Sequence, residues 1–146
     1  MVSEHQEQCS LITWTAYASV TYPELDLLFA IPNGGKRQRV IAAKLKAEGV
    51  KSGVPDLMLP VARGNYHGLF VEMKRKDGKE SPNQKVWRER LIAENYQAIV
   101  CHSWLEAKDA IIFYLNLQPH LIERLIHQTL MIGIDGDKLI ARCSDE

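Results

Sequence analysis

The sequence predicts an α/β fold in which a central mixed β-sheet is flanked by helices. Apolar stretches of strand length alternate along the chain with segments whose apolar residues recur at helical spacing. Clusters of Gly, Pro, Asn and Asp separate these segments, as turns do. The chain has 146 residues, 46% of them hydrophobic, which is enough for one compact core. We therefore expect one domain over residues 1–116, followed by an appendage over residues 117–146.

The N-terminal third is expected to form a helix, a short strand and a second helix. Residues 4–20 carry apolar side chains at helical spacing, and the Ser3 hydroxyl can cap the first turn. Residues 25–31 form an apolar run of strand length. Helix formers dominate residues 36–48, and Gly49 is placed to end that helix.

A β-hairpin is expected next in the chain. Residues 56–59 and 69–74 are two apolar runs that a turn-rich segment separates. Pro55 can open the first strand, because its missing N–H matters least at the first residue of a strand. Strand side chains alternate between the two faces of a sheet, so Glu72 and Lys74 should project from the same face.

A further helix should begin at Ser81, with Pro82 at its first position, and end near residue 94. Its apolar residues Val86, Leu91 and Ile92 are expected to point inward. Beyond it we expect a strand at residues 98–101, an amphipathic helix at 104–117, a short helical stretch to about residue 129, and a β-hairpin around Asp135-Gly136.

Composition argues against several classes of protein. No apolar run approaches the roughly 18 residues needed to cross a bilayer, and the N-terminus lacks the pattern of a signal peptide. A soluble, cytoplasmic protein without membrane contact is therefore expected. The three cysteines are too widely spaced for a disulfide framework or a zinc ribbon. His5 and Cys9 stand i, i+4 on the first helix, but no second pair would complete a zinc site.

Charge is distributed unevenly, although 18 Lys and Arg balance 18 Asp and Glu. Residues 36–51 hold six Lys or Arg and one Glu, a balance of +5. Residues 117–146 hold three basic and five acidic residues, a balance of −2. A basic segment of this kind is either a solvated helix face or a surface for nucleic-acid phosphates.

Asp56, Glu72 and Lys74 form the constellation in which chemistry is expected. Asp56 follows a proline, and fifteen residues separate it from Glu-x-Lys, so pairing of the two strands would bring both carboxylates together. Such hard oxygen ligands suit Mg²⁺ or Mn²⁺, and a metal held there can lower the pKa of water and neutralise charge on a scissile phosphate. Each residue alone could be an ordinary turn or ion-pair residue. However, the strand around Glu72 and Lys74 is almost fully apolar, and charges in such surroundings need a partner or a metal.

Five segments of the chain, taken together, resemble the VRR-NUC branch of the PD-(D/E)XK nucleases. They are Glu4 with Gln8, residues 31–35 (IPNGG), residues 53–57 (GVPDL), residues 70–74 (FVEMK), and residues 81–84 (SPNQ) leading into Trp87. Pro-Asp and Glu-x-Lys alone match many unrelated chains, whereas five segments at these intervals are highly specific. The resemblance covers about residues 4–115. It implies a restriction-endonuclease-like αβββαβ core and a metal-dependent DNA endonuclease.

The resemblance also implies roles for the residues of the constellation. Asp56 and Glu72 would be metal ligands, with the Met73 carbonyl as a further ligand. Lys74 would be the catalytic lysine, placed to position the attacking water or to stabilise the oxyanion.

Two further residues that the resemblance adds to the site have alternatives. Glu4 would be an additional acidic residue, but Glu7 lies one turn away on the same side of the helix. Gln84 would complete the site, or could only cap its own helix. Tyr66 and Trp87 are either packing residues, as lone aromatic residues more often are, or stack on bases.

DNA contact is expected at a glycine-rich turn and at nearby basic residues. Residues 33–35 could be only a tight turn, or their main-chain amides could form an anion-binding nest for a phosphate. Phosphate contacts position DNA without reading its sequence, and no module for base readout is apparent, so structure-selective cleavage is expected. The expected DNA-binding residues are Asn33, Gly34, Gly35, Lys36, Arg37, Arg39 and Lys76.

Small stand-alone members of this family are similar to Holliday-junction resolvases, act as homodimers and are often encoded by phages or prophages. The resemblance therefore implies a homodimer whose two-fold symmetry suits paired incisions on branched DNA. The alternatives are a flap or general duplex nuclease in phage DNA processing, and a non-catalytic DNA-binding protein of the same fold.

Overall fold

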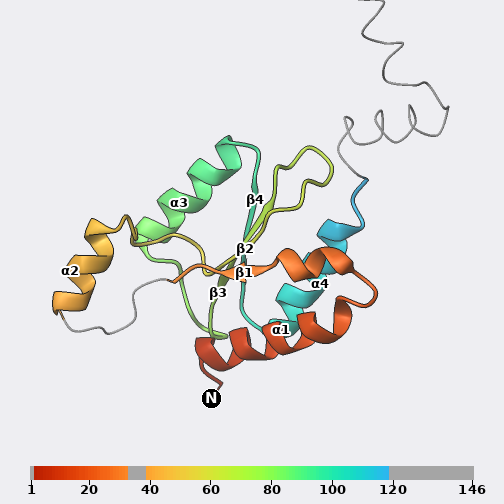
Figure 1. Cartoon of the computed structure of the whole chain (residues 1–146), viewed down its shortest axis with the longest axis horizontal. Coiled ribbons are helices and arrows are strands. Elements are labelled where there is room, and N and C mark those ends of the chain that lie inside the picture. The colour runs from red at the N-terminus through yellow and green to blue at the C-terminus, as the bar shows by residue number, and fades with distance from the viewer. Residues whose placement is uncertain (1, 33–38, 119–146) are drawn as a thin grey trace, which may run out of the picture.

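The computed structural model describes residues 2–32 and 39–118 (Figure 1). The predicted turn at residues 33–35 and the predicted helix and β-hairpin of the tail lie outside these ranges. In chain order the elements are α1 (Glu4–Ala18), the 3₁₀ helix η1 (Pro23–Leu27), β1 (Phe29–Ala30), α2 (Arg39–Ala47), β2 (Leu57–Leu59), β3 (Leu69–Met73), α3 (Pro82–Ala93), β4 (Gln97–Cys101) and α4 (Trp104–Leu115).

The four strands form one mixed sheet in the order β1-β2-β3-β4. The first two pairings are antiparallel, as in the predicted hairpin, and β3 pairs with β4 in parallel. A parallel neighbour requires a crossover connection, and α3 provides it. The predicted αβββαβ core with its central mixed sheet is confirmed.

The two faces of the sheet have different roles. On β3, Leu69, Val71 and Met73 alternate with Phe70 and Glu72. The first three belong to the buried core together with residues of α1 and α4. Phe70 and Glu72 therefore project from the opposite face. Figure 1 shows α1 and α4 on one side of the sheet and α3 on the other, so Glu72, the charged residue of β3, lies on the face that α3 partly covers.

The core between the sheet, α1 and α4 is closely packed. Leu11, Ile111 and Tyr114 are all fully buried there. The Tyr114 hydroxyl donates a 2.6 Å hydrogen bond to the Val61 carbonyl, which satisfies the one polar group on that side chain. The ring of Tyr66 lies 6.3 Å from that of Tyr114, so Tyr66 is a packing residue. No helix in the described ranges is long and apolar enough to cross a membrane.

Local sequence signals set the helix ends. Ser3 caps α1 through a reciprocal pair of hydrogen bonds with Gln6, and Ser81 caps α3 in the same way with Gln84. Gly49 follows α2 with φ +96°, a left-handed conformation that glycine adopts without strain. The predicted cap at Ser3, the start at Ser81 and the stop at Gly49 are all confirmed.

The prediction of a strand over residues 25–31 is wrong in its first half. Pro23 opens the 3₁₀ helix η1, in which Leu25 is buried and accepts a 3.0 Å hydrogen bond from the Leu28 N–H. Proline fixes its own φ at a value that suits a helical turn, and this local preference prevails over the apolar run. Only Phe29 and Ala30 remain as strand.

The expectation that α3 buries its apolar side chains is also wrong for two of three residues. Val86 is 51% exposed and Ile92 48% exposed, and α3 contains no buried residue. Leu91 is partly buried. The face of the sheet beneath α3 carries Glu72 instead of a continuous apolar surface, so the helix has little apolar area against which to pack.

Candidate active site

The β2–β3 pairing brings the two predicted carboxylates together. Leu57 lies opposite Val71 in this antiparallel ladder, and the same register continued by one residue places Asp56 opposite Glu72. Side chains that face each other across such a pair have Cβ atoms about 5 Å apart. Asp56 Oδ2 also accepts a 2.9 Å hydrogen bond from the Met73 N–H, which fixes the carboxylate at the end of the strand.

Glu72 is the most enclosed charged residue of the site. Its exposed fraction is 3%, and that of Lys74 is 7%. Lys74 Nζ lies 2.7 Å from Glu72 Oε1, and the side-chain amide of Gln84 donates a hydrogen bond to the same oxygen. The second oxygen, Oε2, is buried and has no hydrogen-bond partner among the described residues. A buried carboxylate oxygen without a partner is costly, so Oε2 is a candidate ligand atom for a cation.

Burial raises the pKa of Glu72 from 4.5 to about 7. The hydrogen bond and charge of Lys74 lower this pKa, while the negative charges of Asp56 and Glu4 raise it. For Lys74, burial alone lowers the pKa, but the hydrogen bond to Glu72 and the three surrounding carboxylates outweigh burial and leave the pKa above its ordinary value. The site thus holds a firmly charged lysine and more carboxylate charge than one lysine neutralises.

Gln84 serves two purposes that the sequence presents as alternatives. Its Oε1 atom accepts a 2.8 Å hydrogen bond from the Ser81 N–H, which completes the cap of α3. Its Nε2 atom donates to Glu72. The amide has both an acceptor and a donor, so one side chain can cap the start of the helix and also hold the carboxylate.

A close main-chain approach joins the Asp56 segment to α3. Gly53 has φ +90°, and a Cβ atom built on it would lie 2.7 Å from the carbonyl carbon of Asn83. Only glycine allows this contact, which keeps the loop before Asp56 against the first turn of α3, where Gln84 lies. From the sequence, Gly53 was expected to have no role beyond its place in a motif. A glycine three residues before the carboxylate was the signal that could have indicated one.

The structure separates the two acidic residues of α1. Glu7 Oε2 accepts a 2.8 Å hydrogen bond from the Trp104 N–H at the start of α4, so Glu7 is occupied in helix packing. Glu4 Oε1 lies 3.4 Å from the Arg75 amide nitrogen, and its charge acts on both Glu72 and Lys74. Glu4, not Glu7, faces the site.

The donors at this site fit Mg²⁺ or Mn²⁺. The unpartnered oxygen of Glu72, the Asp56 carboxylate and the Met73 carbonyl are all hard oxygen ligands. Within residues 2–32 and 39–118, no group of three or more His, Cys, Asp or Glu residues could hold a metal by itself. Water and substrate phosphate would therefore have to supply further ligands, as is usual for Mg²⁺. Cys9 Sγ and His5 Nε2 lie 3.6 Å apart on α1, but the described part of the chain adds no third ligand to them, which does not suit zinc.

Of the predicted DNA-binding residues, only two fall within the described residues. Arg39 is the first residue of α2, and Lys76 is exposed in the loop between β3 and α3, two residues beyond Lys74. His102 Nε2 lies 3.1 Å from the Gly78 carbonyl oxygen and ties this loop to the end of β4. This role of His102 was not predicted from the sequence. The five other residues, 33–37, lie outside the described ranges.

Comparisons with known proteins agree with this fold. The family model of the VRR-NUC domain matches residues 2–104 of the chain. A solved structure of a VRR_NUC domain protein is similar with a TM-score of 0.71 and 31% sequence identity, and the match covers 82% of this chain and 93% of that one. No curated protein matches the chain.

Proposed function

The chain belongs to the VRR-NUC family of nuclease-type domains, and on this premise we propose that it is a Mg²⁺- or Mn²⁺-dependent endodeoxyribonuclease. One observation carries the proposal. Glu72 is buried opposite Asp56, hydrogen-bonded to Lys74, and left with one oxygen that has no partner among the described residues. A non-catalytic DNA-binding domain has no need of such a costly arrangement.

Each residue of the site has a distinct task in this proposal. Asp56, Glu72 and the Met73 carbonyl would hold the cation, which supplies charge neutralisation at the phosphate and a more acidic water. The Gln84 amide holds one oxygen of Glu72, so the other oxygen would be left to bind the cation. The Lys74 ammonium, which hydrogen bonds to Glu72, would stabilise negative charge on the scissile phosphate.

Branched DNA is the proposed substrate, cut by a homodimer as in Holliday-junction resolution. Exposed cations beside the site, such as Lys76, can contact phosphates without reading bases. Two-fold symmetry would pair two sites on one junction. Flap or general duplex cleavage is the alternative in the same class of reaction.

The test uses labelled four-way junction, flap and linear duplex DNA, each with Mg²⁺, Mn²⁺ or EDTA. We expect cleavage only with a divalent cation, and a loss of about 100-fold or more in Asp56→Asn and Lys74→Ala. The matched controls are Asp109→Asn and Lys108→Ala, an ion pair of 3.3 Å on α4, across the sheet from the site. Both should cleave like the wild type.

Cleavage that survives EDTA, or that survives both site substitutions, would rule out the proposed site. Paired symmetric nicks in the junction alone would support the resolvase proposal. Preference for the flap or equal cleavage of linear duplex would instead select the alternative. Light scattering of the purified protein tests the homodimer separately.

A further inference from the structure

A second recess lies beside the proposed active site. It is an open groove of about 430 Å³ bounded by the end of β1, the segment after α2 and Trp87 of α3. Its apolar walls are formed by Ile31, Pro32, Val50, Val54 and Trp87. A groove of this size and composition is in the range of small-molecule and nucleobase sites, whereas a phosphate site would be lined by donors.

The aromatic wall of the groove is fixed and accompanied by a cation. Trp87 Nε1 donates a 3.2 Å hydrogen bond to the Ser52 carbonyl, which sets the orientation of the indole ring. Lys51 Nζ lies 6.0 Å from the ring centroid. Lys51 is exposed, and none of the ion pairs found in the described ranges involves it. An aromatic plane next to a free ammonium is the combination with which proteins hold single-stranded nucleic acid.

The groove adjoins the catalytic residues along two elements. Trp87 is three residues after Gln84 on α3, so the two side chains lie on one side of the helix, roughly 4.5 Å apart along its axis. Val54 is two residues before Asp56, and the contact of Gly53 with Asn83 holds these two segments together. A strand whose phosphate lies at Glu72 would therefore have its neighbouring nucleotide within reach of the groove.

We propose that the groove binds an unpaired nucleobase next to the scissile phosphate, with Trp87 stacking on the base and Lys51 contacting the adjoining phosphate. This inference rests on the proposed nuclease function and adds to its substrates DNA in which unpaired and paired nucleotides meet, as they do in a flap. Bases inside a duplex are covered on both faces by their neighbours, so only a base outside the stack can use the indole wall.

Binding measured in EDTA tests the groove without cleavage. Fluorescence anisotropy would compare a blunt duplex with the same duplex carrying a single-stranded extension, and 2-aminopurine at the first unpaired position would report stacking. For Trp87→Ala we expect the Kd of the extended DNA to rise roughly 5- to 100-fold and the quenching of 2-aminopurine to disappear. The Kd of the blunt duplex should stay the same. Trp87→Phe, which keeps an aromatic plane, should retain most of both signals.

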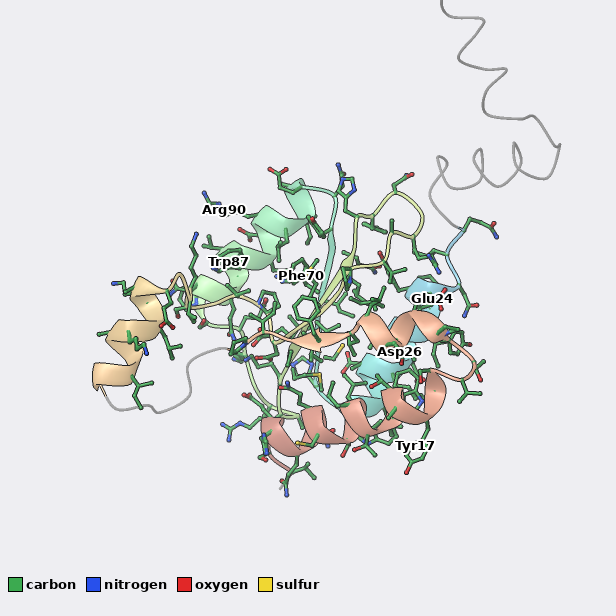
Figure 2. All side chains as sticks on the ribbon, viewed as in Figure 1. Tyr17, Glu24, Asp26, Phe70, Trp87 and Arg90 are labelled. Carbon is green, nitrogen blue, oxygen red and sulfur yellow. The ribbon has the colours of Figure 1, made fainter. Side chains whose placement is uncertain are left out.

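Tyr17→Ala is the matched control, because Tyr17 is an aromatic residue on α1, 77% exposed, and lies away from Trp87 in Figure 2. It should bind both DNAs like the wild type. If the melting temperature of Trp87→Ala is lower than that of the wild type, binding is compared for Trp87→Phe and Lys51→Ala instead. Lys51→Ala should weaken binding of the extended DNA while the protein keeps its melting temperature.

Equal loss of affinity for both DNAs, or no loss for either, would overturn the inference and leave the groove to another occupant or to a structural role. The proposed function fails on a different result. If the wild type binds the extended DNA selectively but cleaves nothing with Mg²⁺ or Mn²⁺, the groove is supported and the nuclease proposal is refuted.

Discussion

The buried carboxylate of Glu72 should make the stability of the metal-free protein depend on pH in an unusual direction. The pKa of Glu72 is raised from 4.5 to about 7 by burial. Between these two values the folded state binds more protons at Glu72 than the unfolded state does. The free energy of unfolding must therefore fall as the pH rises from about 5 through about 7. Most carboxylates in ion pairs have the opposite effect.

The size of the effect follows from the two pKa values. A rise from 4.5 to about 7 at about 1.4 kcal/mol for each pH unit corresponds to a total of about 3 kcal/mol. Roughly 2 to 3 kcal/mol of this should be lost between pH 5 and pH 8. Glu72→Gln removes the titration. It also removes the ion-pair partner of Lys74. Because that ammonium stays charged throughout this pH range, the destabilisation from the lost partner is the same at every pH.

The measurement is urea unfolding in EDTA at half-unit steps from pH 5 to pH 8, for the wild type and Glu72→Gln. The difference in free energy of unfolding between the two proteins should move by roughly 2 to 3 kcal/mol in favour of the variant as the pH rises. Glu94→Gln is the control. Glu94 is an exposed carboxylate at the end of α3, so the difference between this variant and the wild type should change much less with pH.

Parallel pH profiles for the wild type and Glu72→Gln would refute the reasoning. They would mean that Glu72 titrates as an ordinary carboxylate, and therefore that water reaches it in the metal-free protein. A change in the opposite direction would mean that Lys74 stabilises the carboxylate by more than burial costs it.

Two further predictions concern the residues that hold the site together. Gly53→Ala should destabilise the protein by more than about 1 kcal/mol and reduce cleavage, because the added Cβ would overlap Asn83. Gly49 has a similar φ but no atom near the position of an added Cβ. Gly49→Ala should therefore lose only the stability that the strained backbone costs, and it should cleave normally. Equal effects of the two substitutions on unfolding and cleavage would contradict this. Ser81→Ala should lower the free energy of unfolding in urea by about 1 kcal/mol but keep its cleavage activity per folded molecule. Gln84→Ala should lose similar stability and, in addition, cleave roughly 10- to 100-fold more slowly. Similar cleavage rates for both variants would show that Gln84 is only a cap.

Much of the fold could be predicted because its signals are local. A capping serine hydrogen bonds to the third residue of its own helix, so the cap depends only on residues close in the chain. The starts of α1 and α3 could therefore be predicted at Ser3 and Ser81. Gly49 ends α2 for the same reason. The hairpin of β2 and β3 follows from two apolar runs close in the chain. The first half of residues 25–31 was mispredicted, because an apolar run does not distinguish a strand from a short helical turn.

Failures of prediction occur where the answer depends on what an element packs against. Val86 and Ile92 follow helical spacing but remain half exposed, since the sheet beneath α3 presents Glu72 and not a continuous apolar surface. Glu4 and Glu7 are equivalent by spacing along α1. Only the position of α4, whose first amide hydrogen bonds to Glu7, distinguishes them.

By itself, the sequence determined which residue types could perform the chemistry and, through strand alternation, that Glu72 and Lys74 share a face. The tertiary structure decided how those residues act together. A cross-strand register places Asp56 opposite Glu72, a glycine contact brings Gln84 to the same carboxylate, and burial leaves one oxygen of Glu72 without a partner among the described residues. The physical reason is that residue identity and side-chain alternation are local properties. Desolvation and charge coupling instead depend on atoms that lie far apart in the chain.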